Sequence, residues 1–164
     1  MPHCPPPGAD VLDGTSPKLT AGSLQDDWLR RDLSEHANDC TLAYWHHPRF
    51  SSSKHGNDER SDGTWRTLYE LAADVILNGH DHVYERFAPQ RPDGTADPRG
   101  IRQFTIGTGG APFYDFPTIR PNSESRVQNA YGVLKLVLRA QAYDWEFVSP
   151  EGVRDSGTAA CRTR

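Results

Sequence analysis

The sequence predicts an α/β fold in which a βαβ portion is followed by mostly antiparallel strands. Two short, almost wholly apolar runs, at residues 41–45 and 74–78, are typical of strands that are buried on both faces of a parallel sheet, and a helical pattern lies between them. After residue 83, extended runs alternate with turn-rich stretches. The chain therefore changes from parallel to antiparallel sheet about halfway along its length.

The first half is expected to contain two helices. Residues 1–22 are rich in Pro, Gly and Asp without any period, which predicts an irregular segment before a folded region over 23–164. Ser23, with Asp26 three positions later, is typical of a helix start and indicates a helix over about 23–37. Apolar side chains at three- and four-residue steps support both helices. They are Leu24, Trp28, Leu29 and Leu33 in the first helix and Trp65, Leu68, Tyr69 and Ala72 in the second.

The second half is expected to be mostly antiparallel sheet. Its extended runs lie at residues 83–88, 101–106, 131–138 and 143–148. In the third run, apolar and polar side chains alternate, as in a sheet with one buried face and one solvated face. The apolar positions are Leu134, Leu136 and Leu138.

Composition excludes two classes of partner. The formal net charge is -4 and the sequence pI is about 5.9, with acidic and basic residues mixed, so the chain lacks the basic surface of a nucleic-acid-binding protein. No apolar stretch approaches the roughly 18 residues that suggest a membrane span. The first residues have neither a basic region nor an apolar core, so we find no signal peptide after Met1.

The three cysteines leave several arrangements open. Cys4, Cys40 and Cys161 are widely spaced and include no Cys-x-x-Cys pair, which argues against a thiolate zinc site. One disulfide with an unpaired third cysteine, a partner outside this chain, and free thiols in a cytosolic protein all fit this spacing.

Histidines lie where metal ligands are expected. His46 follows the first parallel-type strand, and His80 and His82 follow the second, so the carboxyl ends of two neighbouring strands bring them to one edge of the sheet. In extended backbone His80 and His82 would face the same way, and Asp81 would face elsewhere. The alternative is that the His-x-His pair belongs to an ordinary surface loop. Five of the seven histidines fall between residues 46 and 82, which favours a metal site.

Two ordered motifs resemble those of a known family. The motifs are Trp45-His46-His47-Pro48-Arg49-Phe50 and Gly79-His80-Asp81-His82-Val83-Tyr84-Glu85-Arg86. They resemble the last two motifs of the calcineurin-like metallophosphoesterases, within the purple acid phosphatase-like and bacterial alkaline phosphatase-like branch. The resemblance implies that residues 23–164 are the C-terminal half of such a domain and an incomplete part of its four-layer α/β-β/α sandwich.

The resemblance also implies roles for individual residues. His46 and His80 would bind one metal ion and His82 the other, in a dinuclear centre of Fe, Zn or Mn. His55, in the polar loop 49–62, resembles the histidine that contacts the substrate phosphate or protonates the leaving group, although it is equally well explained as an ordinary loop histidine. His47 would be a pocket residue at most, and a contact between Glu85 and Arg86 would lock the strand.

The family's other metal-binding motifs do not occur in this chain. They are Asp-x-His, Gly-Asp-x-x-Asp/Tyr and Gly-Asn-His-Asp/Glu, and they supply the carboxylates, including the one that bridges the two metals. The resemblance implies hydrolysis of a small phosphorylated substrate, with a phosphomonoester expected, by two-metal activation of water. The missing ligands would be supplied by an N-terminal half outside this chain. The alternatives are a non-catalytic remnant or a single-metal-binding interaction domain, and a gene that begins upstream of Met1. We expect the full-length protein to be secreted or periplasmic.

Overall fold

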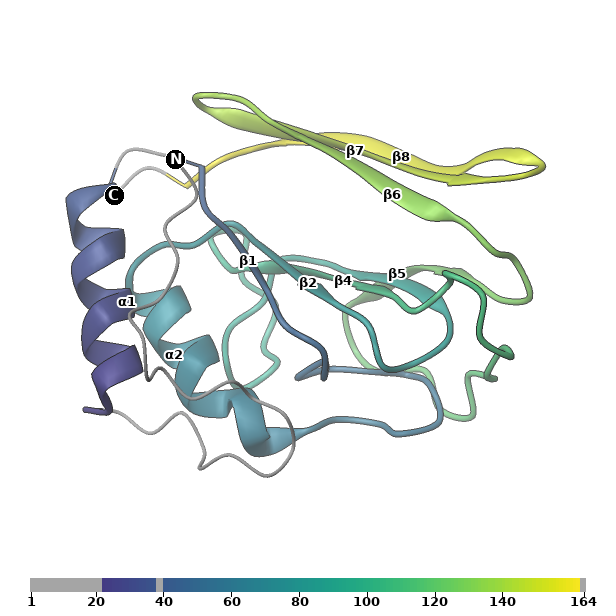
Figure 1. Ribbon diagram of the computed structural model, residues 1–164, viewed down its shortest axis with the longest axis horizontal. Coiled ribbons are helices and arrows are strands. Elements are labelled where there is room, and N and C mark those ends of the chain that lie inside the picture. Colours follow the sequence, from purple (N-terminus) through teal and green to yellow (C-terminus); the bar gives the residue numbers. More distant parts are fainter. Residues whose placement is uncertain (1–21, 38–39, 163–164) are drawn as a thin grey trace.

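The fold consists of three layers, which are two helices, a five-stranded sheet and a three-stranded sheet (Figure 1). The computed structural model describes residues 22–37 and 40–162. The helices cover one face of the five-stranded sheet, and the three-stranded sheet lies over the other face. The segment that was expected to be irregular spans residues 1–22, and all of it except Gly22 lies outside the described residues.

Both expected helices form. Helix α1 spans Leu24–Glu35, and the Ser23 hydroxyl accepts the backbone N–H of Asp26 at 3.2 Å, as the cap pattern predicts. A short 3-10 turn, η1 (Glu59–Ser61), leads directly into helix α2, which spans Asp62–Glu70 and buries Trp65 and Leu68. The second helix therefore begins inside the region that was expected to be a polar loop.

The five-stranded sheet has the order β1-β2-β4-β3-β5. Strands β1, β2 and β4 are parallel, whereas β3 pairs antiparallel with both β4 and β5, so the expected change in strand direction is confirmed. The carboxyl ends of β1 and β2 lie side by side. The bounds are β1 Leu42–Tyr44, β2 Val75–Asn78, β3 Tyr84–Phe87, β4 Arg102–Ile106 and β5 Ser123–Val127.

The central sheet is buried on both faces. Neighbouring residues of β2 show this, because Ile76 packs into the core under the helices and Val75 packs into the core between the two sheets, and both are fully buried. This two-sided burial explains the continuous apolar runs in the sequence. The helix-side core is completed by Trp65, Leu68, Phe87 and Ile101, and the inter-sheet core by Tyr84, Phe104, Trp145 and Phe147.

The three-stranded sheet is an antiparallel meander of β6 (Val133–Leu138), β7 (Ala142–Ser149) and β8 (Gly152–Ala160). Leu134 and Leu136 pack towards the inter-sheet core, as the alternation predicts, whereas Leu138 is 41% exposed at the strand end. A disulfide joins Cys40, before β1, to Cys161, after β8, with 5.5 Å between their Cα atoms. Cys4 lies outside the described residues. No helix in the described part of the chain is long and apolar enough to cross a membrane.

Strand β1 is an open edge of the five-stranded sheet. Within the described residues it pairs only with β2, and Tyr44 on this edge is 80% exposed. Unpaired strand edges with exposed apolar side chains promote association between copies. We therefore expect the molar mass measured by light scattering to rise with concentration, and Tyr44→Lys to lower this association because a charged edge opposes strand pairing. A monomeric unaltered chain at all concentrations would contradict this expectation.

Candidate metal centre

The loops after β1 and β2 are hydrogen-bonded to each other. The Gly79 N–H donates to the His46 carbonyl at 3.0 Å, and the Asn78 side-chain amide donates to the Trp45 carbonyl at 2.9 Å. The Trp45 ring N–H donates to the His47 carbonyl at 2.7 Å. These bonds fix the backbone of both histidine-bearing loops, so the strand ends bring His46 and His80 together as the sequence predicts.

Three imidazole rings converge at this edge of the sheet. His80 Nδ1 lies 3.1 Å from His46 Nε2, and one ring nitrogen of each of His46, His47 and His80 lies within 4.8 Å of the others. The ring centroids of His47 and His80 are 4.2 Å apart. The sequence placed His47 in the pocket at most, whereas the structure places its ring nitrogen among those of the two expected ligands.

The backbone turns sharply at His80. Its φ is 59°, in the left-handed region that non-glycine residues rarely adopt. The Gly79-His80-Asp81 segment is therefore a turn and not an extended strand, so the alternation expected for His80 and His82 does not apply. As a result, His82 lies outside the three-nitrogen group.

His82 is held by the segment that follows β4. The His82 ring stacks on Tyr114 with 4.2 Å between centroids. The His82 Nδ1 lies 2.7 Å from the Pro112 carbonyl oxygen, and because a carbonyl oxygen can only accept, Nδ1 must carry the proton and donate. The Nε2 atom is thereby left with its lone pair. A metal-binding histidine typically donates its other N–H to a backbone carbonyl in this way.

His55 contacts the cluster from the loop between β1 and α2. Its Nδ1 donates to the Asp81 carboxylate at 2.6 Å, and its ring packs against His80 with 4.2 Å between centroids. Asp81 is fully buried and also accepts the Ser51 hydroxyl. Asp81 is not part of the three-nitrogen group, and its carboxylate fixes the position of His55.

Two further residues, Glu85 and Gly107, make close contacts next to this site. Glu85 is fully buried and accepts the Ser52 N–H at 2.9 Å and the Ser123 hydroxyl at 2.5 Å, and burial raises its pKa. The expected contact between Glu85 and Arg86 is wrong, because neighbouring residues of a strand point to opposite faces. Gly107 lies directly against the Asp81 carbonyl, where an added Cβ would come within 2.0 Å of the oxygen, so the glycine-rich stretch after β4 is a close turn beside the site.

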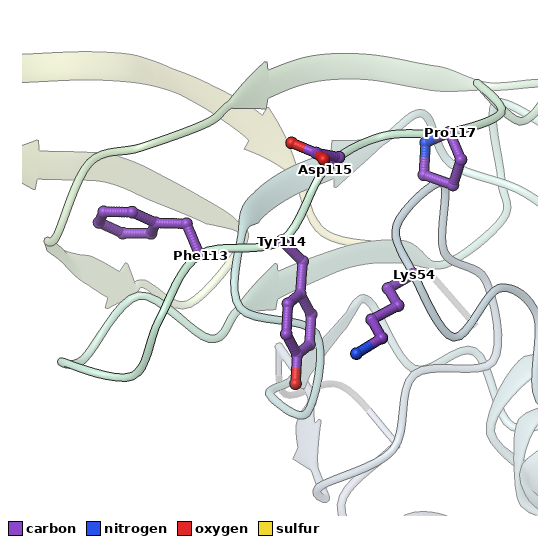
Figure 2. A pocket seen from close by; sticks show the side chains of 5 residues that line it. All are labelled: Lys54, Phe113, Tyr114, Asp115 and Pro117. Carbon is purple, nitrogen blue, oxygen red and sulfur yellow. The ribbon is translucent and has the colours of Figure 1, made fainter.

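A pocket of about 320 Å³ opens beside His55 and His82 and is lined by Lys54, Phe113, Tyr114, Asp115 and Pro117. Figure 2 shows the Lys54 side chain beside the Tyr114 ring, with 4.8 Å between the ammonium nitrogen and the ring centroid. Tyr114 also contacts the rings of both His55 and His82. The pocket therefore offers a cation and an aromatic face next to the histidines.

Two of the clustered imidazoles, those of His47 and His80, favour their neutral forms. Burial, followed by the neighbouring His47, His55 and His46, lowers the pKa of His80 to about 4. Burial, followed by the charge of Arg60, lowers the pKa of His47. Neutral imidazole is the form that binds metal ions.

The donors present suit one metal ion better than two. The three-nitrogen group includes no carboxylate, and the buried Asp81 carboxylate is already occupied by Ser51 and His55. A dinuclear centre needs anionic ligands that offset its charge and bridge the two ions. The described residues therefore do not fit a complete dinuclear centre.

Comparisons with known proteins agree with this fold and these motifs. The sequence profile of the calcineurin-like phosphoesterases matches residues 5–84. Purple acid phosphatase 18 of Arabidopsis thaliana is 34% identical over 94 residues, which are 54% of this chain and 21% of that protein. Purple acid phosphatase 21 of the same plant is 34% identical over 106 residues, which are 61% of this chain and 24% of that protein. The chain thus spans about a fifth to a quarter of the length of these relatives.

Solved structures share the fold. Purple acid phosphatase PPD1 from yellow lupin (Lupinus luteus) seeds superposes with a TM-score of 0.75 at 18% identity, over 86% of this chain and 29% of that chain. GAP50, the anchor in the inner membrane complex of Plasmodium, superposes with a TM-score of 0.65 at 17% identity, over 85% of this chain and 43% of that chain.

The fold, the motifs and the profile match over residues 5–84 make this chain similar to the calcineurin-like phosphoesterases. The two curated relatives, which match 54% and 61% of this chain, are purple acid phosphatases, and the lupin structure shares the fold. This chain matches part of that larger α/β fold, and three layers of the expected four-layer sandwich occur in the described residues.

Proposed function

We propose that this chain forms part of a metal-dependent phosphoester hydrolase, specifically a phosphomonoesterase, whose complete site holds a dinuclear metal centre. The observation that carries the proposal is the approach of His46 Nε2 and His80 Nδ1 to 3.1 Å at the carboxyl edge of the parallel strands, with His55 against them. His46 and His80 would be ligands of one ion. Carboxylate ligands would come from a polypeptide segment outside these 164 residues.

His82 would bind the second ion through Nε2. Two contacts support this role, since the Pro112 carbonyl holds the opposite ring nitrogen as a donor and Tyr114 fixes the ring plane. The ring is thereby oriented with its lone pair away from the protein segment that holds it.

His55 would act on the substrate. Because the Asp81 carboxylate accepts the Nδ1 proton of His55, the second ring nitrogen is left to contact a phosphate oxygen or to hold a proton for the leaving group. Lys54 and Tyr114 would line the approach of the substrate, where the ammonium group attracts the phosphate charge. The disulfide supports a protein that works in an oxidising compartment, secreted or periplasmic.

Phosphatase assays test this proposal in two polypeptides. The purified 164-residue chain is expected to show little or no metal-dependent hydrolysis of p-nitrophenyl phosphate, because the described residues lack carboxylate ligands at the cluster. A polypeptide extended upstream to include Asp-x-His and Gly-Asn-His-Asp/Glu is expected to hydrolyse it. In that polypeptide His80→Ala should remove activity, and His55→Ala should lower kcat about 10²- to 10⁴-fold.

Different results would contradict the need for the missing motifs and the proposed phosphomonoesterase activity. Turnover by the 164-residue chain that is abolished by His80→Ala would contradict the need for the missing motifs. A folded extended polypeptide that carries two metal ions and yet hydrolyses no phosphomonoester would contradict the proposed activity. His36→Ala, which changes the histidine at the C-cap of α1, outside both motifs, is the matched control and should retain activity.

A second candidate function is a non-catalytic metal-binding domain. The observation that favours it is the absence of a carboxylate from the three-nitrogen group among the described residues. Elemental analysis of the extended polypeptide distinguishes the candidates, because two metal ions in each folded molecule favour the enzyme, and one or none favours the non-catalytic domain.

A further inference from the structure

The three-nitrogen group of His46, His47 and His80 differs from the ligand set that the motifs imply. The motifs assign His46, His80 and His82, whereas the ring nitrogen that joins His46 and His80 in space belongs to His47. Zinc binds imidazole nitrogen at about 2.0–2.1 Å in a tetrahedral arrangement, which places two donors about 3.3 Å apart. The pair of His46 Nε2 and His80 Nδ1, at 3.1 Å, already has this separation.

The backbone that carries these three rings is held from several sides. The His46 carbonyl accepts Gly79 N–H, and the His47 carbonyl accepts the Trp45 ring N–H. The Asn78 amide donates to the Trp45 carbonyl at 2.9 Å. On this backbone, one ring nitrogen of each of the three histidines already lies within 4.8 Å of the others.

The strained turn at His80 is a second, independent feature of this place. A left-handed backbone at a non-glycine residue costs about 1–3 kcal/mol and persists where the surroundings determine it. Here φ of 59° directs the ring of His80 onto those of His46, His47 and His55. The left-handed turn at His80 is thus part of the arrangement in which the three rings meet.

The chemistry of the donors selects the ion. Three neutral nitrogen ligands without a carboxylate suit zinc and similar divalent transition ions, and not magnesium or calcium, which prefer oxygen ligands. His46 is exposed, so the fourth position of the ion can be taken by water from solvent. We propose that His46, His47 and His80 form a site for one zinc-like divalent ion, which this chain binds without any further protein ligand.

His82 does not contribute to this site. Its Nδ1 is bonded to the Pro112 carbonyl and its ring is stacked on Tyr114, outside the three-nitrogen group. This site shares His46 and His80 with the proposed phosphoesterase centre and adds His47. Its test measures one bound ion and no hydrolysis, so the two proposals can fail separately.

Titration of the purified chain with Co²⁺, followed by visible absorption, tests the site, with Zn²⁺ competition to measure affinity. We expect one ion in each chain. Loss of a residue that only hydrogen-bonds to a metal ligand weakens metal binding by roughly 10- to 100-fold. His47→Ala and His46→Ala each remove a ligand, so each should weaken binding by at least this factor. His36→Ala, which changes a histidine outside the group, should bind as the unaltered chain does. His3→Ala controls for the N-terminal histidine.

A measurement without substitution guards against variants that fail to fold. In a chain with ¹⁵N-labelled histidine, Zn²⁺ should shift the ring nitrogen resonances of His46, His47 and His80 and leave those of His82 in place. Equal affinity of His47→Ala and the unaltered chain would overturn the proposal. So would a Zn²⁺ shift at His82 without one at His47, or no binding at all.

Discussion

Asp155→Ala is expected to lower the free energy of unfolding by up to about 3–5 kcal/mol, the cost of removing one partner from a buried ion pair. Arg86 keeps its second ion pair, with Glu124, which limits the loss. The Asp155 carboxylate lies between the two sheets and accepts hydrogen bonds from Tyr84 Oη at 2.6 Å, from Arg86 Nε at 2.7 Å and from Trp145 Nε1 at 3.1 Å. The side chains of Arg86 and Asp155 are only 13% and 11% exposed. Urea denaturation followed by tryptophan fluorescence measures the loss.

Asp144→Ala is the matched control. Asp144 lies on β7, the neighbour of β8, and pairs at the surface with Arg139. Exposed ion pairs contribute about 0–1 kcal/mol, so this variant should unfold almost as the unaltered chain does. An equal effect of the two substitutions would show that the Asp155 network does not join the sheets.

The pH dependence of this difference has a defined sign. Burial alone would raise the pKa of Asp155, but hydrogen bonds from Arg86 and Tyr84 leave it below its usual value. A lowered pKa contributes stability above the unfolded-state value, about 3.9, and that contribution is lost as the pH falls through the folded-state value. The stability difference between the unaltered chain and Asp155→Ala should therefore be full at neutral pH and shrink below about pH 4.

Removal of the disulfide is expected to have a similar effect. Cys40 and Cys161 are separated by 121 positions, and a cross-link that closes a loop of this length restricts the unfolded chain by about 4–5 kcal/mol. The double variant Cys40→Ala, Cys161→Ala should therefore lose about that much stability in urea denaturation. The bond also holds the end of β8 beside the start of β1, so both segments should lose hydrogen-exchange protection.

Reduction provides the internal control for this prediction. A reducing agent should lower the stability of the unaltered chain towards that of the double variant and should leave the double variant unchanged. Cys4→Ala removes the cysteine outside the Cys40–Cys161 bond and should leave stability unchanged. A double variant as stable as the oxidised chain would show that the cross-link does not stabilise the fold.

Segments with a strong local pattern were predictable from sequence. Strands β1 and β2 carry continuous apolar runs because both of their faces are buried, and α1 carries its own cap at Ser23. Strands β5 and β8 were missed. Their sequences, Ser-Glu-Ser-Arg-Val and Gly-Val-Arg-Asp-Ser-Gly-Thr-Ala-Ala, are mostly polar or small, and they form strands because β3 and β7 supply hydrogen-bonding partners.

The sequence by itself determined the α/β class, the change from parallel to antiparallel strands, and the meeting of His46 and His80 at one sheet edge. These follow from local periodicity and from the fact that parallel strands end on the same side. Only the tertiary structure decided that His47 joins them, that Asp81 holds His55, and that Asp155 links the two sheets. The backbone at His80 and contacts between residues far apart in sequence set these features, and no local pattern encodes them.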